Sequence, residues 1–117
     1  MKNILMAIVA VFLFGTITAQ GDIISAKDFV KLAKTNKNLV IVDASKAESY
    51  SKVHVKNAVN IPHATLYKEG DIDGLIKDPA DLAAIFGEKG VVDGKTIVVY
   101  DGGSQKYSSR VYWILKY

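Results

Sequence analysis

The sequence predicts an α/β domain built on a parallel β-sheet, because apolar runs of strand length alternate with stretches of helical periodicity. Residues 96–100, TIVVY, are β-branched and aromatic without alternation, which is typical of a strand covered on both faces. We therefore expect this strand in the middle of the sheet. From Tyr107 onward apolar residues recur at helical spacing. The change of period within one short loop indicates a strand, a turn and a helix.

The other predicted elements follow in chain order: a short strand at 23–24, a helix at 26–35, a buried strand at 39–42, a short polar helix around 48–50, a strand at 58–61, a long loop at 64–77 and a helix after residue 78. Ser25 with Asp28 has the form of a capping box. Asp78 before Pro79 is typical of an N-cap and a first helical turn. Strands that alternate with helices favour parallel pairing with right-handed crossovers.

Composition narrows the class of protein. The 117-residue chain is half apolar, has two prolines and shows no repeat, so we expect a single globular domain over residues 22–117. The net charge of +3 comes from dispersed lysines and arginines and gives little reason to expect nucleic acid as a partner. Cysteine is absent, which excludes disulfides and a cysteine nucleophile. Without thiolates, His54 and His63 make a poor metal set, and we expect neither metal nor cofactor.

Residues 1–19 have the layout of a secretory signal peptide. Lys2 supplies a positive charge, residues 4–14 form an uninterrupted apolar stretch, and small Ala19 would be the last residue removed. The apolar run is shorter than the ~20 residues that a spanning helix needs. We therefore expect cleavage and export to the periplasm or the exterior, with no stable membrane span. The alternative is an uncleaved membrane anchor.

The loop after the strand at 96–100 is the candidate functional site. It lies outside the carboxyl end of a parallel strand and before a helix, where α/β folds usually bind ligands. Small residues there let backbone N–H groups converge on an anion. The candidate anion-binding residues are Asp101, Gly102, Gly103, Ser104, Gln105 and Lys106. An ordinary strand-to-helix turn explains the same composition without any ligand. Asp43, a second acid at a strand end, either supports this edge or caps the helix that follows.

Two stretches of the chain resemble the rhodanese-like sulfurtransferases. Residues 50–62, YSKVHVKNAVNIP, are similar to the family signature Tyr-x-x-Gly-His-Ile-Pro-Gly-Ala-x-Asn-Ile-Pro. The matching residues are Tyr50, His54, Ala58, Asn60, Ile61 and Pro62, and the departures are Val53, Lys56 and Asn57. Residues 97–115 form the second stretch, which in active members of the family resembles I-V-x-Tyr-Cys-x-x-Gly-x-Arg-Ser. The resemblance covers nearly all of residues 23–117 and implies a rhodanese-like parallel sheet flanked by helices.

Asp101 stands at the position that resembles the catalytic cysteine of the family, so the resemblance implies no catalytic residue in this chain. Sulfur transfer needs a thiolate that can carry sulfur as a persulfide, and a carboxylate cannot do so. The carboxylate would repel an anionic donor such as thiosulfate, and it could satisfy the loop N–H groups itself. Lys106 falls near the family's loop arginine. His54 and Arg110 are supporting candidates, with Arg110 expected to orient the loop or to pair with an acid.

The pattern Tyr-Asp-Gly followed by Tyr-x-x-Arg-Val-x-Trp resembles the non-catalytic amino-terminal domain of tandem thiosulfate or mercaptopyruvate sulfurtransferases. In those proteins a second domain carries the cysteine. The resemblance implies a structural and docking half for a catalytic rhodanese domain located C-terminally in the full gene, with small sulfur-containing anions as further candidate ligands. The alternative is an exported stand-alone module that binds a small anion or a protein.

The resemblance also implies that the sheet is incomplete. The family has a five-stranded sheet, in which the last strand lies beside the strand that precedes the loop. We expect this chain to lack that last strand and its helix. Residues 20–117 alone would then be molten or would aggregate, because the strand at 96–100 would expose unpaired backbone groups.

Overall fold

A computed structural model describes residues 22–117 of the chain, which divides into two units at residues 1–37 and 38–117. The predicted signal peptide at residues 1–19 lies outside the described residues. No helix within residues 22–117 combines the length and apolar character required to cross a membrane.

The described part of the first unit consists of helix α2 (Ala26–Thr35) and its flanks. The predicted cap is present, because the Ser25 side chain accepts a hydrogen bond from the N–H of Asp28 at 3.1 Å. The strand predicted at residues 23–24 is wrong. Ile23 is 88% exposed and belongs to no strand, since no described strand pairs with this segment to form a ladder.

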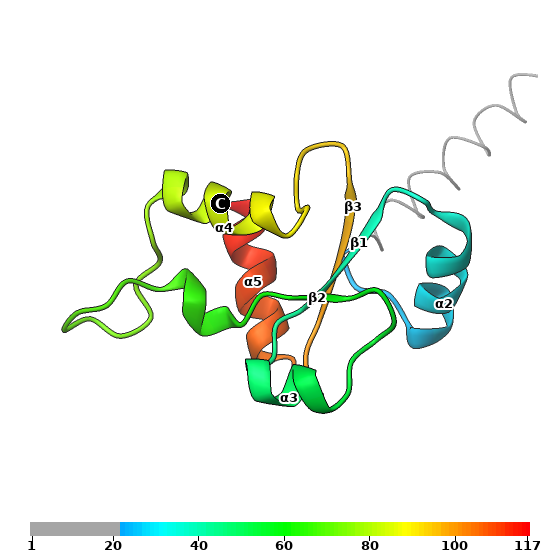
Figure 1. Ribbon diagram of the computed structural model, residues 1–117, viewed down its shortest axis with the longest axis horizontal. Helices are drawn as coiled ribbons and strands as arrows, with labels where there is room; N and C mark the ends of the chain where they lie inside the picture. The colour runs from blue at the N-terminus through cyan, green and yellow to red at the C-terminus, as the bar shows by residue number, and fades with distance from the viewer. Residues whose placement is uncertain (1–21) are drawn as a thin grey trace, which may run out of the picture. The chain divides into compact units, whose positions relative to one another are not determined.

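The second unit is built on a three-stranded parallel sheet (Figure 1). The strands are β1 (Leu39–Asp43), β2 (Val59–Asn60) and β3 (Thr96–Tyr100), in the order β2-β1-β3. Val42 of β1 lies opposite Val59 of β2, and Asp43 lies opposite Tyr100 of β3. The carboxyl ends of β1 and β3 therefore meet at one edge of the sheet, as the sequence predicts for a parallel α/β domain.

Within the described residues β1 occupies the centre of the sheet, so the central position expected for β3 from its apolar run is wrong, while its exposed ladder agrees with what the family resemblance implies. The Thr96 N–H donates to the Asn38 carbonyl, and the Ala44 N–H donates to the Tyr100 carbonyl. In a parallel ladder alternate residues face the same neighbour, so residues 97 and 99 direct their backbone groups away from β1. No described strand pairs with that side, and residues 97–100 are accordingly half-buried rather than buried.

Four helical segments connect and cover the strands of this unit: α3 (Ala47–Lys52), the 3₁₀ turn η1 (His63–Leu66), α4 (Pro79–Glu88) and α5 (Lys106–Lys116). The helices predicted around residues 48–50, after residue 78 and from residue 107 are confirmed. The prediction of a long loop at 64–77 is wrong in part, since the chain first completes η1 and then forms a bridge between Tyr67 and Ile76. Between η1 and α4 the chain extends away from the sheet (Figure 1).

Asp78 occupies the N-cap position of α4, as predicted. Its carboxylate makes no capping hydrogen bond and pairs with Lys68 at 2.8 Å. Pro79 does open the helix, as expected. The helix ends before Gly90, whose φ of 83° is a left-handed conformation that glycine adopts without strain.

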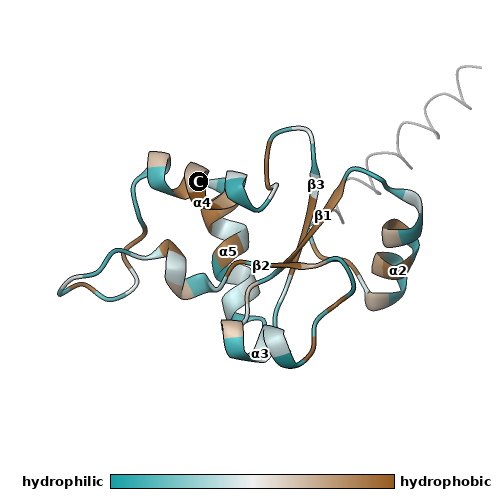
Figure 2. Cartoon of the chain, viewed as in Figure 1, coloured by the Kyte–Doolittle hydropathy of each residue, from teal (hydrophilic) through white to brown (hydrophobic). Residues whose placement is uncertain are grey.

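The core lies where β1, η1, α4 and α5 meet. Val42, Leu66 and Val111 are fully buried there, and they come from β1, η1 and α5. Leu82 and Phe86 of α4 complete the cluster. Figure 2 shows the hydrophobic colour concentrated along β1 and on α4. This packing holds the carboxyl ends of β1 and β3 beside the start of α5, where the candidate loop lies.

Candidate functional site

The loop between β3 and α5 is organised by the side chain of Asp101. One carboxylate oxygen, Oδ1, accepts hydrogen bonds from the N–H groups of Gly103 at 2.9 Å and Gln105 at 3.0 Å. The other oxygen, Oδ2, accepts from the N–H of Ser108 at 2.9 Å. Gln105, the residue at the N-cap position of α5, makes no side-chain cap. The Asp101 carboxylate therefore takes two N–H donors of the loop that the sequence predicts as an anion cradle, and one more from the first turn of α5.

These donors determine the charge state of Asp101. Burial by itself raises the pKa of the carboxyl group, but the N–H groups of Ser108, Gly103 and Gln105 stabilise the carboxylate and together lower the pKa below its usual value. Asp101 is consequently ionised at neutral pH, and the cradle already holds a negative charge that belongs to the chain.

Asp43 is the buried acid at the end of the neighbouring strand, with 2% of its surface exposed. Its Oδ1 accepts a hydrogen bond from the N–H of Ser45 at 2.8 Å, which closes a local turn. The N-cap of α3 is Lys46, so the alternative in which Asp43 caps that helix is wrong. The Asn60 side chain donates to the Asp43 carbonyl at 3.0 Å and to the Ser45 carbonyl at 2.9 Å. Asp43 and Asn60 thus order the carboxyl ends of β1 and β2.

Tyr100 is a site residue that sequence reasoning missed. Its hydroxyl accepts the N–H of Val55 at 2.9 Å and also hydrogen-bonds to the side chain of Asp43. Burial raises the pKa of Tyr100 to about 12, and the contact with Asp43 adds to that effect while the Val55 donor opposes it. The available signal was the tyrosine in the family pattern directly before the cysteine position. The Tyr100 hydroxyl, through its bond with Val55, links the segment between α3 and β2 to the end of β3.

His54 lies in the segment that connects α3 to β2. Its Nδ1 lies 2.7 Å from the carbonyl oxygen of Tyr50, and because a carbonyl can only accept, Nδ1 carries the proton. The imidazole stacks on the Tyr50 ring with centroids 3.8 Å apart. The Tyr50 hydroxyl in turn donates to the Ala58 carbonyl at 2.6 Å. Tyr50 therefore supports His54 and closes the segment that leads to β2.

An open hollow of about 480 Å³ brings several of the predicted residues together. Its lining consists of Asp43, Ser45, Ser49, Val53, His54, Val55, Tyr100, Asp101, Gly102 and Gly103. No lysine or arginine is among these residues, whereas two carboxylates are. An anionic sulfur donor would therefore meet negative charge in the hollow, which agrees with the repulsion expected from the sequence.

The predicted basic residues do not line the hollow. The Nη2 of Arg110 donates to the Gly74 carbonyl at 2.6 Å, and the guanidinium lies 5.2 Å from the Tyr67 ring centroid. The expectation that Arg110 orients the loop at 101–106 or pairs with an acid is therefore wrong. Arg110 instead contacts the segment between η1 and α4, residues 67–78, which we call the excursion. The Lys106 ammonium lies 6.0 Å over the ring of Tyr107. Ser104 contributes one long contact, accepting the Lys106 N–H at 3.4 Å.

Within residues 22–117 no group of three or more acidic or histidine side chains is arranged to hold a metal ion. His54 and His63 contact different partners, the Tyr50 carbonyl and the Tyr67 hydroxyl.

Comparison with known proteins agrees with this fold and with the resemblance of the two motifs. The family profile described as Rhodanese-like domain matches residues 25–117, so the chain belongs to the rhodanese-like domain family. A thiosulfate sulfurtransferase from Pseudomonas aeruginosa is 35% identical over 78 residues. The aligned region covers 66% of this chain but 29% of that relative, so the chain spans less than a third of the relative's length.

Proposed function

We propose that this chain is a non-catalytic rhodanese domain that serves as the structural and docking half for a catalytic rhodanese domain. The observation that carries the proposal is the Asp101 carboxylate, which stands where the family motif has its cysteine and takes two backbone donors of the loop and one of the first turn of α5. A loop filled in this way has an ordered backbone and offers no nucleophile.

The chemistry of sulfur transfer supports this assignment. A thiolate attacks the outer sulfur of thiosulfate, whose S–S bond breaks to release sulfite, and the sulfur held as a persulfide then passes to an acceptor that regenerates the thiolate. The chain has no cysteine at any position, so no such thiolate exists. The hollow beside Asp101 has two carboxylates in its lining and no cation to attract thiosulfate. Activity in a complete protein would then depend on a cysteine supplied by another domain.

The family resemblance and the size of the relative support the proposed docking role. Tandem members, as the resemblance implies, pair a domain of this kind with a second domain that carries the cysteine. The thiosulfate sulfurtransferase relative is more than three times as long as its aligned region. A catalytic rhodanese domain is therefore the partner that we propose.

We propose export as the location of the domain, with cleavage after Ala19. The support is the positive charge, the apolar stretch and the small residue at the end of residues 1–19. The intact mass of protein recovered outside the cytoplasm tests this proposal. A mass that still includes residues 1–19 would show that the segment is retained.

A cyanide assay tests the absence of catalysis. The purified chain should form no thiocyanate from thiosulfate or mercaptopyruvate above a blank without protein. Asp101→Cys should give at most weak activity, because the loop has no arginine and its backbone is organised around a carboxylate. Asp71→Cys, which places a thiol in an exposed bend, is the matched control and should give none. Thiocyanate produced by the unmodified chain would overturn the assignment.

A mixing experiment tests the docking role. A separately produced rhodanese domain that carries the cysteine should form a complex with this chain, and its melting temperature should rise when the chain is added. Co-elution of the two domains on a sizing column is the measurement. Independent elution and an unchanged melting temperature would contradict the docking role while leaving the absence of catalysis intact.

A further inference from the structure

Three basic side chains gather around His63, on a surface outside the hollow that Asp101 lines. Lys46, Lys106 and Arg110 are all exposed, and we call these three residues the basic patch. Lys46 precedes α3, whereas Lys106 and Arg110 lie on the first turns of α5. Each of the three lowers the pKa of the half-buried His63 through its charge, in addition to the larger effect of burial. The three cations therefore act on one small region of the surface.

An aromatic base supports the basic patch. His63 stacks on Tyr107 with ring centroids 3.8 Å apart and planes 7° apart, and its Nδ1 lies 3.1 Å from the Tyr67 hydroxyl. Lys106 lies over Tyr107, and Arg110 lies over Tyr67. These contacts join η1 to α5 and hold the cationic groups of Lys106 and Arg110 at the surface.

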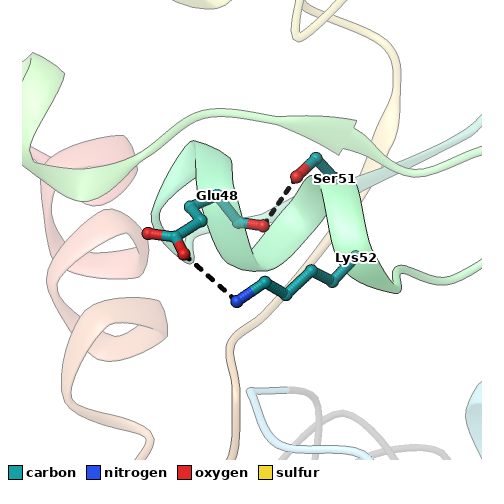
Figure 3. A network of polar contacts seen from close by, with 3 residues as sticks. All are labelled: Glu48, Ser51 and Lys52. Atoms are coloured by element: carbon teal, nitrogen blue, oxygen red, sulfur yellow. Dashed lines mark hydrogen bonds and ion pairs between the residues drawn. The ribbon is translucent and has the colours of Figure 1, made fainter.

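No acidic side chain neutralises the basic patch in the described part of the chain. The ion pairs within residues 22–117 join Lys52 to Glu48 and Lys68 to Asp78. Glu48 is the acid nearest to Lys46 along the sequence, but its carboxylate pairs with Lys52 at 3.1 Å within α3 (Figure 3). No carboxylate is among the groups that act on His63. The positive charge of the patch is therefore available to a partner.

The aromatic contacts favour carboxylates over nucleic acid as the ligands of this surface. Single-stranded nucleic acid is usually held by bases that stack on accessible aromatic faces. Here Tyr107 is engaged by His63 and Lys106, and Tyr67 is engaged by Arg110. What the surface offers is three exposed cationic side chains, and the Arg110 guanidinium, which gives one N–H to the Gly74 carbonyl, keeps further N–H groups that suit a carboxylate.

We propose that the basic patch is a docking surface for an acidic segment of a partner protein. The proposal rests on the proposed function in one respect, since it names the surface through which the docking half would hold its partner. The patch adjoins the loop of Asp101 through Lys106, the first residue of α5. An acidic segment bound there would lie next to the loop without entering the hollow.

The test measures binding of a fluorescent polyglutamate peptide to the full chain and to two charge-reversed variants. Lys46→Glu with Lys106→Glu removes two cations of the patch and leaves the contacts of Arg110 in place. Lys89→Glu with Lys95→Glu changes the net charge equally at exposed positions outside the patch and is the matched control. The patch variant should bind about tenfold more weakly, the control should bind within about twofold of the unmodified chain, and added salt should weaken binding. Circular dichroism of both variants should match the unmodified chain, because the exchanged side chains are exposed.

Several outcomes would overturn the proposal. Equal losses in the two variants would show a response to net charge instead of a surface site. A thymidine oligonucleotide that binds more tightly than polyglutamate would identify nucleic acid as the ligand, and equal displacement of the peptide by dilute sulfate would identify a small-anion site. Failure of the chain to bind a catalytic rhodanese domain, with polyglutamate binding retained, would contradict the proposed function alone, because the basic patch would still bind an acidic segment.

Discussion

The Oδ2 oxygen of Asp101 accepts a hydrogen bond from the N–H of Ser108 at 2.9 Å, which ties the end of β3 to the first turn of α5. Together with the two hydrogen bonds that Oδ1 accepts, this bond occupies three backbone N–H groups that could otherwise bind an anion. Asp101, which stands in place of the family's cysteine nucleophile, thus also stabilises the loop.

Replacement of Asp101 should lower stability at neutral pH. Asp101→Asn replaces one accepting oxygen with an NH2 group and removes the charge from the hydrogen bonds that remain, and we expect a loss of roughly 1–2 kcal/mol in the free energy of unfolding, measured by urea denaturation. Asp71→Asn, in an exposed bend, is the control and should change stability little. An unchanged unfolding midpoint for Asp101→Asn would show that the three bonds contribute nothing.

The same bonds predict a dependence of stability on acid. The folded-state pKa of Asp101 lies below its unfolded value of about 3.9, so its contribution is fully present above that value. The contribution is lost as the pH falls through the lower, folded-state pKa. The difference in stability between the unmodified chain and Asp101→Asn should therefore shrink on acidification. A difference that grows in acid would contradict this assignment.

Tyr100 should lose its proton only at strongly alkaline pH. Its folded-state pKa of about 12 lies above the ordinary value, so the neutral hydroxyl stabilises the fold below about pH 10, and this contribution is lost as the pH rises through the folded value. Tyr100→Phe leaves the Val55 N–H without its partner and leaves the buried Asp43 carboxylate with the Ser45 N–H alone, and it should cost roughly 1–3 kcal/mol. Tyr117→Phe, at an 86% exposed position, is the control. In a titration followed by phenolate absorbance, the step near pH 12 should be present in the unmodified chain and absent from Tyr100→Phe.

Arg110 should stabilise the excursion between η1 and α4. Arg110→Ala removes the donor to the Gly74 carbonyl and the contact with Tyr67, so the Lys68 amide, which donates to Leu75, should exchange faster. Arg110→Lys keeps the charge without the planar fork and should restore only part of the protection. Exchange of the Lys68 amide at the same rate in all three proteins would contradict this role.

The outer edge of β3 should exchange rapidly. The backbone N–H and C=O groups of Val98 face β1, whereas those of residues 97 and 99 face away from β1 and pair with no described strand. In residues 20–117 the amides of Ile97 and Val99 should therefore exchange much faster than that of Val98, as measured by hydrogen exchange. A chain extended by a further strand and helix should protect all three. Equal protection of the three amides in residues 20–117 would contradict the expected gap in the sheet.

Local sequence patterns predicted the elements that depend on short-range physics. The β-branched run at 96–100, the Ser25 cap and the periodicity from Tyr107 act within a few residues, and the structure has each of these features. The Asp101 side chain was also expected to satisfy the loop, because its donors follow within seven residues. Patterns of this range predicted both the strand–loop–helix unit and the contacts that close its loop.

The errors concern relationships across longer distances in the chain. Arg110 reaches Gly74, which lies 36 residues earlier, and no local spacing indicates that contact. Asp78 is the predicted N-cap residue, but no local pattern indicates that its carboxylate pairs with Lys68, ten residues earlier. The edge position of β3 depends on which strands pair, and apolar composition alone does not determine pairing. Tertiary contacts decide each of these features.

The central claim, that Asp101 fills the anion cradle of the loop, is tested most directly by observing the loop amides during a thiosulfate titration. At neutral pH the backbone N–H signals of Gly103, Gln105 and Ser108 should not shift as thiosulfate is added, because each group already donates to the Asp101 carboxylate. Saturable shifts of these three signals in the unmodified chain would show that the cradle accepts an external anion, and they would contradict the account.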